Sequence, residues 1–120
     1  MRRYEKLRCY QRADAIVLAI YTNSGEFPHH ETYALRSQIR RSAVSIVSNI
    51  VEGTSRSSTR ELRRFVDYAY GSARELHYQW ELAVRLGYTT ELQILRDIDE
   101  VAADLFSLRR SRDRKLGGCD

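Results

Sequence analysis

The side chains with the clearest capacity for chemistry in this sequence are arginines gathered in one stretch. Residues 36–64 contain seven arginines and two glutamates, which gives this stretch a net charge of +5. A guanidinium group presents a planar fork of N–H donors that matches the oxygens of phosphate and of carboxylate. The stretch is therefore suited to anion recognition, and the arginines alone do not say whether the anion is a nucleic acid or an acidic protein.

Six of these arginines are the candidate nucleic-acid-binding residues. In this interpretation they form an arginine-rich surface that contacts backbone phosphates, and each neutralised phosphate makes binding more sensitive to salt. The alternative is a solvated surface on which the arginines pair with neighbours such as Glu61, and both interpretations stay open. The six residues are Arg36, Arg40, Arg56, Arg60, Arg63 and Arg64.

The next stretch of the chain has the opposite charge. Residues 65–104 contain three arginines and eight acidic residues, a net charge of −5, and both ends of the chain are basic again. A protein polarised in this way offers one surface to a polyanion and another to a basic partner or to a second copy of itself.

No group of residues has the spacing of a metal site or of a catalytic centre. A carboxylate-bridged metal site in a helical bundle needs Glu-x-x-His pairs on two helices, and the one pair with this spacing, Glu26 and His29, is interrupted by Pro28. Cys9 and Cys119 stand near opposite ends of the chain, outside any ligand or nucleophile motif. We therefore expect no metal, no cofactor and no catalytic residue, and we expect the protein not to be an enzyme.

Length and composition are typical of one soluble helical domain. The 120 residues are 42% hydrophobic and 30% charged and include one proline, which argues against a disordered chain. The longest apolar run, residues 15–20, is far shorter than the roughly 20 residues that cross a membrane. The charged N-terminus leads directly into helical periodicity, so we expect no secretory segment, no membrane contact and a cytoplasmic location with reduced cysteines.

Apolar residues recur at spacings of three and four in four segments, and this periodicity predicts an all-α protein. The predicted helices cover residues 3–24, 31–52, 58–86 and 90–110, followed by a basic flexible tail at 111–120. Short connections require antiparallel neighbours, so residues 1–120 are predicted to form a single domain, an up-down-up-down four-helix bundle. Gly53 is expected in the left-handed position that ends a helix, and Ser58 and Thr90 are expected to open capping boxes.

Each of the two central helices also carries a polar stripe beside its apolar one. Such a stripe is either a solvated face or a hydrogen-bonded seam against a neighbouring helix or subunit, and both interpretations stay open. Across the stripes, Glu75 is a candidate partner for Arg41, and the small pair Gly71–Ser72 would let another helix approach closely. The stripes consist of Gln38, Arg41, Ser45, Asn49 and Glu52 on the first of these helices and of Tyr68, Ser72, Glu75 and Gln79 on the second.

The central helices also resemble a known bacterial family. The motifs that carry the resemblance are Leu35-x-x-Gln38-x-x-Arg41, Ser48-Asn49-Ile50-x-Glu52-Gly53 and Ala69-x-Gly71-Ser72-x-x-Glu75. They resemble the four helix bundle protein family, whose members are encoded in intervening sequences of 23S ribosomal RNA genes. The chain is also similar to the accessory variability determinant of diversity-generating retroelements, and the resemblance covers residues from about 7 to 108.

The resemblance implies properties that composition and spacing do not show. It implies a four-helix bundle that assembles as a ring-like homopentamer with a basic surface associated with RNA or DNA, and in the retroelement branch with a reverse transcriptase. It also marks structural signature residues, whose polar stripes suggest a seam more than a ligand site. These residues are Gln38, Arg41, Asn49, Glu52, Gly53, Ser72 and Glu75.

Two functional hypotheses of different classes follow. The first is a non-enzymatic homo-oligomer that binds the backbone of RNA or DNA through the six arginines. The second is a protein-interaction scaffold whose basic surface meets an acidic protein, such as a reverse transcriptase or another enzyme, or its own acidic stretch, without touching nucleic acid.

Overall fold

The computed structural model describes residues 3–114, and within this range the chain forms helices and no strands. Two short 3₁₀ helices, η1 (Arg3–Lys6) and η2 (His29–Glu31), accompany four α-helices. The α-helices are α1 (Arg8–Ser24), α2 (Leu35–Thr54), α3 (Thr59–Arg85) and α4 (Gln93–Arg114). The predicted all-α class is confirmed.

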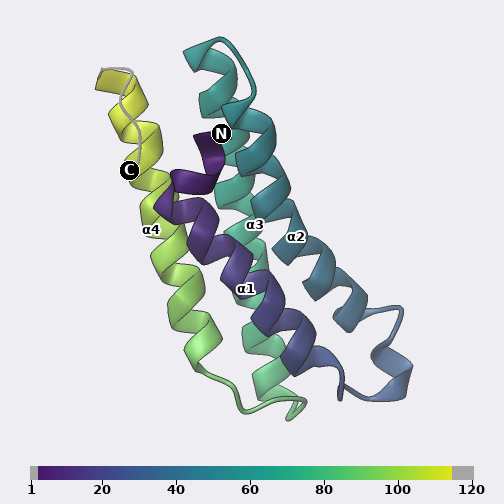
Figure 1. The fold of residues 1–120 in the computed structure, drawn as a ribbon. Helices are drawn as coiled ribbons and strands as arrows, with labels where there is room; N and C mark the ends of the chain where they lie inside the picture. The colour runs from purple at the N-terminus through teal and green to yellow at the C-terminus, as the bar shows by residue number, and fades with distance from the viewer. Residues whose placement is uncertain (1–2, 115–120) are drawn as a thin grey trace.

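The four α-helices form the predicted up-down-up-down bundle (Figure 1). α1 and α3 occupy opposite corners, and each packs against both α2 and α4. The bundle is elongated, with extents of 46 × 22 × 21 Å. In Figure 1 the turn between α2 and α3 extends beyond the start of α1, near the end of α4. We call this the turn end, and the opposite end, with the α1–α2 and α3–α4 connections, the loop end.

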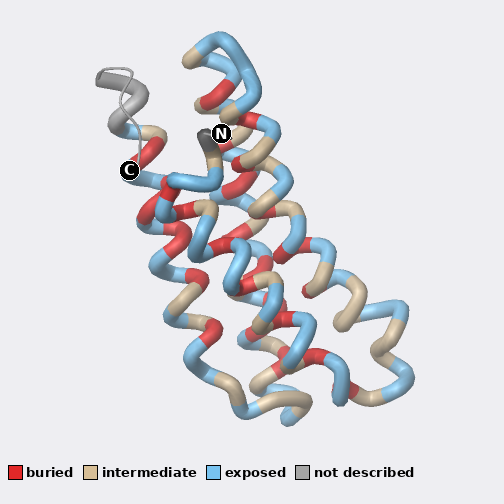
Figure 2. Tube along the Cα trace, in the orientation of Figure 1, coloured by how far each residue is buried: buried red, intermediate tan, exposed pale blue. Residues whose placement is uncertain are grey.

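Packing of one apolar stripe per helix holds the bundle together. Buried residues recur every three or four positions along the helices and are red in Figure 2. Complete burial of one such aliphatic side chain contributes about 1.5–3 kcal/mol, so tertiary packing rather than helix propensity supplies most of the helical stability. Ile20, Ile46, Leu76, Trp80 and Leu105 are among the largest fully buried side chains and represent all four helices.

The first two helices begin later than the periodicity predicts. Leu7 has an extended backbone (φ −76°, ψ 133°) that separates η1 from α1, so the expected continuous helix from residue 3 is interrupted. α2 begins at Leu35 rather than at residue 31 because Glu31 belongs to η2. The carboxylate of Glu31 accepts a hydrogen bond from the backbone N–H of Leu35 at 3.1 Å and so caps α2 from outside the helix.

The two predicted capping boxes have different outcomes. Ser58 caps α3 as predicted, and its Oγ accepts the backbone N–H of Glu61 at 3.1 Å, but the return bond of a capping box, from the Ser58 backbone N–H to the Glu61 carboxylate, is not formed. Thr90 does not open α4, which begins at Gln93; in the preceding connection it is Thr89 whose hydroxyl accepts a backbone N–H. α4 continues to residue 114, four residues beyond the predicted end at 110. The rest of the predicted tail, residues 115–120, lies outside the described residues.

Gly53 has a different role from the predicted one. It lies inside α2, and among the described residues Gly87 alone has a positive φ, at 80°. A Cβ atom at position 53 would stand 2.9 Å from the Cβ of Phe65 and 3.3 Å from the Cδ1 of Leu62, both on α3. The glycine is therefore needed for the close approach of two helices, not to end one of them.

Aromatic side chains close the loop end. Nε1 of Trp80 donates to the backbone oxygen of Glu91 at 2.8 Å, which ties the α3–α4 connection back onto α3. The ring of Phe27, in the α1–α2 connection, lies 5.8 Å from the Trp80 ring and 5.5 Å from the Tyr88 ring. The two connections are thus held against each other by aromatic contacts.

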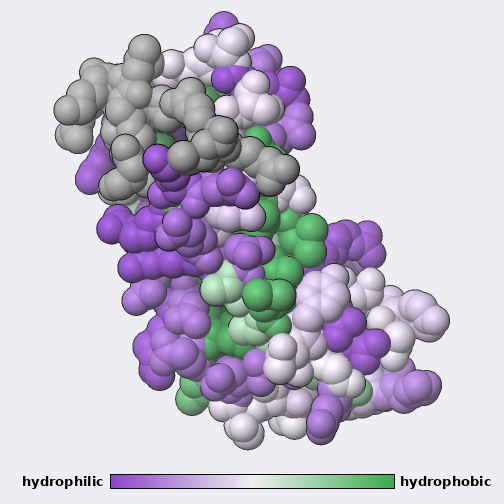
Figure 3. Space-filling model, in the orientation of Figure 1, coloured by the Kyte–Doolittle hydropathy of each residue, from purple (hydrophilic) through white to green (hydrophobic). Residues whose placement is uncertain are grey.

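The surface of the bundle is not uniformly polar. Leu18 of α1 is 65% exposed and Val44 of α2 is 40% exposed, and Figure 3 shows apolar side chains gathering in the middle of the face that α1 occupies. On α3, Tyr68 and Tyr78 are also exposed. Of the helices in residues 3–114, none combines the length and the apolar character needed to span a membrane.

Candidate nucleic-acid interface

Four of the six predicted arginines lie at the turn end, and we call Arg56, Arg60, Arg63 and Arg64 the turn-end arginines. Arg56 belongs to the turn itself, and the other three occupy the first two turns of α3. Because the turn extends beyond the start of α1, it is open to solvent (Figure 1). Arg63 is half-buried and the other three are exposed.

The turn-end arginines differ in what they contact. Arg56 forms an ion pair with Glu52, and its guanidinium carbon lies 5.0 Å from the centre of the Phe65 ring. The side chains of Arg60 and Arg64 form no ion pair and no hydrogen bond with any other described residue. Their positive charges are therefore available to an external anion.

The end of α4 adds further cations to the turn end. Nε of Arg109 contacts Oδ1 of Asp67 at 2.6 Å, which joins α4 to α3 about one turn after Arg63. Arg110 is exposed, and its guanidinium lies 5.4 Å from the centre of the Phe106 ring. Asp67 is paired with Arg109, and the carboxylate of Glu61, beside Arg60, forms no ion pair with a described residue, so neither acid is paired with Arg60 or Arg64.

The other two predicted arginines lie at the loop end. Arg36 and Arg40 belong to the first two turns of α2, whereas Arg56 follows its last residue. At a rise of about 1.5 Å per residue, Arg36 and Arg56 are separated by about 30 Å along the helix axis. The structure therefore divides the predicted arginine surface into two separate groups.

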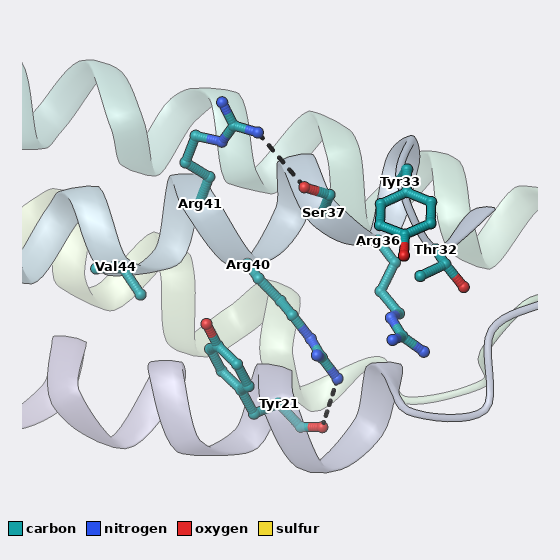
Figure 4. Close-up of a pocket in the computed structure, with 8 residues that line it drawn as sticks. All are labelled: Tyr21, Thr32, Tyr33, Arg36, Ser37, Arg40, Arg41 and Val44. Carbon is teal, nitrogen blue, oxygen red and sulfur yellow. Dashed lines mark hydrogen bonds between the residues drawn. The ribbon is translucent and has the colours of Figure 1, made fainter.

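Arg36, Arg40 and Arg41, which we call the groove arginines, line a groove of about 460 Å³ between the end of α1 and the start of α2. Figure 4 shows Arg36 and Arg40 directed to the same side of α2, toward the end of α1, with the Tyr33 ring beside Arg36. None of the described carboxylates lines the groove. Its lining residues are Tyr21, Thr32, Tyr33, Arg36, Ser37, Arg40, Arg41 and Val44.

The groove arginines contact only neutral groups among the described residues. Arg40 lies over the Tyr21 ring, 4.5 Å from its centre, and its Nε donates to Oγ of Ser24 at 2.9 Å. Arg36 donates to the backbone oxygen of Gly25 at 3.4 Å. Arg41 donates to Oγ of Ser37, also at 3.4 Å. The groove is therefore a concentration of positive charge without an internal counter-ion in the described part of the chain.

The nearby carboxylate of Glu31 is engaged elsewhere. It accepts hydrogen bonds from the hydroxyl of Tyr88 at 2.7 Å and from the backbone N–H of Leu35 at 3.1 Å. The Tyr88 bond, followed by the Leu35 bond, lowers the pKa of Glu31 below its ordinary value of 4.5. The same bond raises the pKa of Tyr88 above its ordinary value of 10.0. At neutral pH this pair is a carboxylate bound to a phenol, and it links the two loop-end connections.

The centre of the two polar stripes is a hydrogen-bonded seam between α2 and α3. The hydroxyls of Ser45 and Ser72 are 2.8 Å apart. Nδ2 of Asn49 donates to the backbone oxygen of Ser45 at 2.8 Å and to its hydroxyl at 3.1 Å. Asn49 and Ser72, two of the signature residues, therefore have a structural role within one chain.

Most of the remaining stripe residues lie on a solvated face. Gln38, Arg41, Glu52, Tyr68 and Glu75 are exposed, whereas Gln79 at the end of the α3 stripe is buried. The predicted pair between Arg41 and Glu75 is not formed, because the Arg41 guanidinium lies against Ser37 one turn earlier on its own helix. Both interpretations of the stripes thus hold, each for a different part of them.

Sequence reasoning missed two residues of the groove. It gave no role to Tyr33, which is 95% exposed, and it assigned Arg41 to the signature rather than to binding. The usable signal was the grouping of three arginines within six residues, shortly after a tyrosine, at a predicted helix start. Hydrophobic periodicity does not register such a grouping because it leaves the apolar stripe unchanged.

The chemistry that this arrangement supports is anion binding. Among the residues that the structure describes, no three His, Cys, Asp or Glu side chains are grouped so that they could hold a metal ion. What the described residues do present is two separate groups of guanidinium donors, at the turn end and at the loop end.

Comparison with known proteins places this fold in a family. The family model for the 23S rRNA-intervening sequence protein matches residues 5–107, which is most of the chain and includes residues of all four helices. The comparison with curated proteins gave no match. The family match confirms the resemblance seen in the motifs of α2 and α3. The chain therefore belongs to the 23S rRNA-intervening sequence protein family.

Proposed function

We propose that this protein is a non-enzymatic, cytoplasmic homo-oligomer that binds the phosphate backbone of RNA or DNA through the turn-end arginines. The observation that carries the proposal is the state of Arg60 and Arg64. Both are exposed in the first two turns of α3 and neither is in an ion pair with a described residue, while the nearby acid Asp67 is bound to Arg109. Guanidinium groups left uncompensated in this way favour a polyanionic ligand.

Assembly is the second part of the proposal, and we assign it to the outer face of α3. Tyr68, Gly71, Glu75 and Tyr78 recur at spacings of three and four and so share one side of the helix. Within the chain, a Cβ atom at Gly71 would meet nothing within 4 Å, and the flanking tyrosines are 50% and 56% exposed. An open glycine between two exposed tyrosines suits close packing of a second copy, and a ring of five copies is our proposed assembly.

The binding experiment compares two charge-reversal variants by fluorescence anisotropy against structured RNA and duplex DNA over a salt series. The test variant is Arg60→Glu, Arg63→Glu and Arg64→Glu. The matched control is Arg74→Glu, Arg85→Glu and Arg96→Glu, which has the same net charge and alters three exposed arginines of the acidic stretch. Protein samples are treated with nuclease before use, and circular dichroism verifies that helicity is unchanged.

We expect the test variant to lose binding and the control to retain most of it. If Arg60, Arg63 and Arg64 each contact one phosphate, together they contribute about 2–3 to the steepness of the wild-type plot of log affinity against log salt. Equal binding by the two variants would overturn the assignment to the turn end. Absence of wild-type binding at low salt would overturn the nucleic-acid proposal and leave the scaffold hypothesis, which predicts protein partners captured after nuclease treatment.

A further inference from the structure

We infer that the groove between the end of α1 and the start of α2 is a second subsite, which holds a single-stranded segment of nucleic acid. In this subsite Arg36 and Arg40 contact phosphates and Tyr33 stacks on an unpaired base. The inference rests on the proposed function and goes beyond it, because it adds a site at the opposite end of the bundle and a preference for unpaired bases.

The charge of the groove is the first support. Arg36, Arg40 and Arg41 have only neutral partners among the described residues, and no carboxylate is among the lining residues. Each guanidinium has five N–H donors, and the bonds that Arg36 and Arg41 make within the protein are long, at 3.4 Å. Most of their donors remain available. The groove also lies at the start of α2, where the helix dipole favours an anion.

The geometry of Arg36 and Arg40 is the second support. They are four residues apart on α2, so their Cβ atoms are about 5–6 Å from each other, and Figure 4 shows both guanidinium groups on the same side of the helix. Arg40 is held in place by the Tyr21 ring and by Ser24, so little side-chain freedom is lost when it binds a ligand. Two guanidinium groups positioned in this way can contact one phosphate or two neighbouring phosphates.

Tyr33 is the reason why we infer a single-stranded nucleic acid rather than a duplex or an acidic peptide. Its side chain is 95% exposed and its ring lies beside Arg36 in Figure 4. An exposed aromatic ring next to phosphate-binding cations is the combination by which proteins bind single-stranded nucleic acid without sequence preference. In a duplex the bases are stacked on each other and do not offer their faces to such a ring. An acidic peptide would satisfy the arginines and leave the ring without a planar partner.

The test measures the affinity of the full chain for a fluorescein-labelled oligouridine, an oligothymidine and a duplex DNA of matched length. The main variant is Tyr33→Ala, which removes a side chain that the fold does not bury. The matched control is Tyr70→Ala, which removes another exposed tyrosine on α3 that belongs neither to the groove nor to the proposed assembly face. Tyr33→Phe keeps the ring, and Arg36→Gln removes one cation of the groove.

We expect Tyr33→Ala to weaken binding of the single strands by about 5- to 150-fold, the range for loss of one base–aromatic stack, with duplex affinity unchanged. Tyr33→Phe and Tyr70→Ala should bind all three probes as the wild type does. Arg36→Gln should reduce the slope of log affinity against log salt by about 0.7 for the single strands. Similar weakening of oligouridine and oligothymidine means that the subsite does not read the 2′-hydroxyl, and weakening of one alone identifies the natural ligand.

Two results would overturn the inference, and they are distinguishable from failure of the proposed function. If the wild type binds the single strands and Tyr33→Ala binds them equally tightly, the groove is not a binding subsite. The turn end then remains the proposed binding site. Competition by polyglutamate for the groove, with equal potency against wild type and Tyr33→Ala, would assign the groove to an acidic protein. If the wild type binds none of the three probes, the proposed function fails first and the subsite fails with it.

Discussion

At the scale of single residues, burial determines what an ion pair contributes. Asp104 of α4 is 6% exposed and is contacted by Arg12 at 2.9 Å and by Arg8 at 3.4 Å, both on α1. A buried carboxylate that loses such partners remains desolvated and uncompensated, so this triad fixes α1 on α4. The exposed pair of Arg56 and Glu52 is worth about 0–1 kcal/mol at most. Arg56 can therefore exchange Glu52 for a phosphate at small cost.

The hydrogen bond between Glu31 and Tyr88 makes stability depend on pH. Because the folded protein lowers the pKa of Glu31, the carboxylate's contribution is complete above 4.5 and is lost as pH falls from 4.5 through the lower folded value. Because the pKa of Tyr88 is raised, the contribution of the phenol is complete below 10.0 and is lost as pH rises through the higher folded value. We expect urea unfolding to show a stability plateau between these limits.

The matched variant for this prediction is Glu31→Gln, which keeps a hydrogen-bond acceptor and removes the titrating group. The difference in unfolding free energy between wild type and variant should be largest at neutral pH and should shrink as pH falls below 4.5. A difference that stays constant over this range would mean that Glu31 acts through packing alone.

At the scale of elements, the contact between α2 and α3 depends on Gly53. Replacing a helical glycine by alanine normally gains about 1 kcal/mol of helix propensity. At this position the added Cβ would stand 2.9 Å from the Cβ of Phe65, an atom fixed to its backbone. Overpacking of this kind costs about 1–3 kcal/mol. After subtraction of the propensity gain, we expect Gly53→Ala to lower the unfolding free energy by up to about 2 kcal/mol, measured by urea denaturation at fixed protein concentration.

The control is Gly25→Ala at the end of α1. Gly25 has φ −64° and ψ −24°, a conformation that alanine adopts readily, and a Cβ added there would meet nothing within 4 Å. This variant should gain about 0.4–1 kcal/mol through the unfolded state. If Gly53→Ala were stabilised as much as Gly25→Ala, the close approach of α2 and α3 would not limit the size of this residue.

Periodicity predicted the four helices and their order because buried residues, such as Ile46 and Leu76, repeat at helical spacing. It did not predict why Gly53 is a glycine, because a close approach between helices depends on a residue far along the chain. The predicted bounds of the second helix, 31–52, already put Arg36 and Arg56 near its opposite ends, so the separation of the two arginine groups could have been predicted from the sequence. The capping hydroxyl of Ser58 was predictable because its partner is three residues away, whereas the bond from Tyr88 to Glu31 spans two connections.

At the scale of the whole molecule, the bundle carries its two groups of arginines at opposite ends. The turn end and the groove carry uncompensated guanidinium groups about 30 Å apart, while the acidic stretch lies on α3, on α4 and in the connection between them. One chain can therefore contact a nucleic acid at two points only if that polymer runs along the bundle. In an assembly, the same sites would be repeated on each copy, and repeated weak contacts would raise the overall affinity.

Assembly is tested directly by light scattering after size-exclusion chromatography at micromolar concentration. We expect the wild type to elute with about five times the 14.0 kDa mass of one chain. Gly71→Leu should reduce the mass to that of the monomer, because the larger side chain blocks the outer face of α3 where a copy would pack. The monomer itself should tolerate the change, since a Cβ at Gly71 meets nothing within 4 Å and leucine is the better helix former.

The matched control is Leu18→Ser, which removes an exposed apolar side chain from α1 and should leave the mass unchanged. A monomeric wild type would contradict assembly. If Leu18→Ser is a monomer and Gly71→Leu keeps the mass of the assembly, the interface lies on the apolar face of α1 instead.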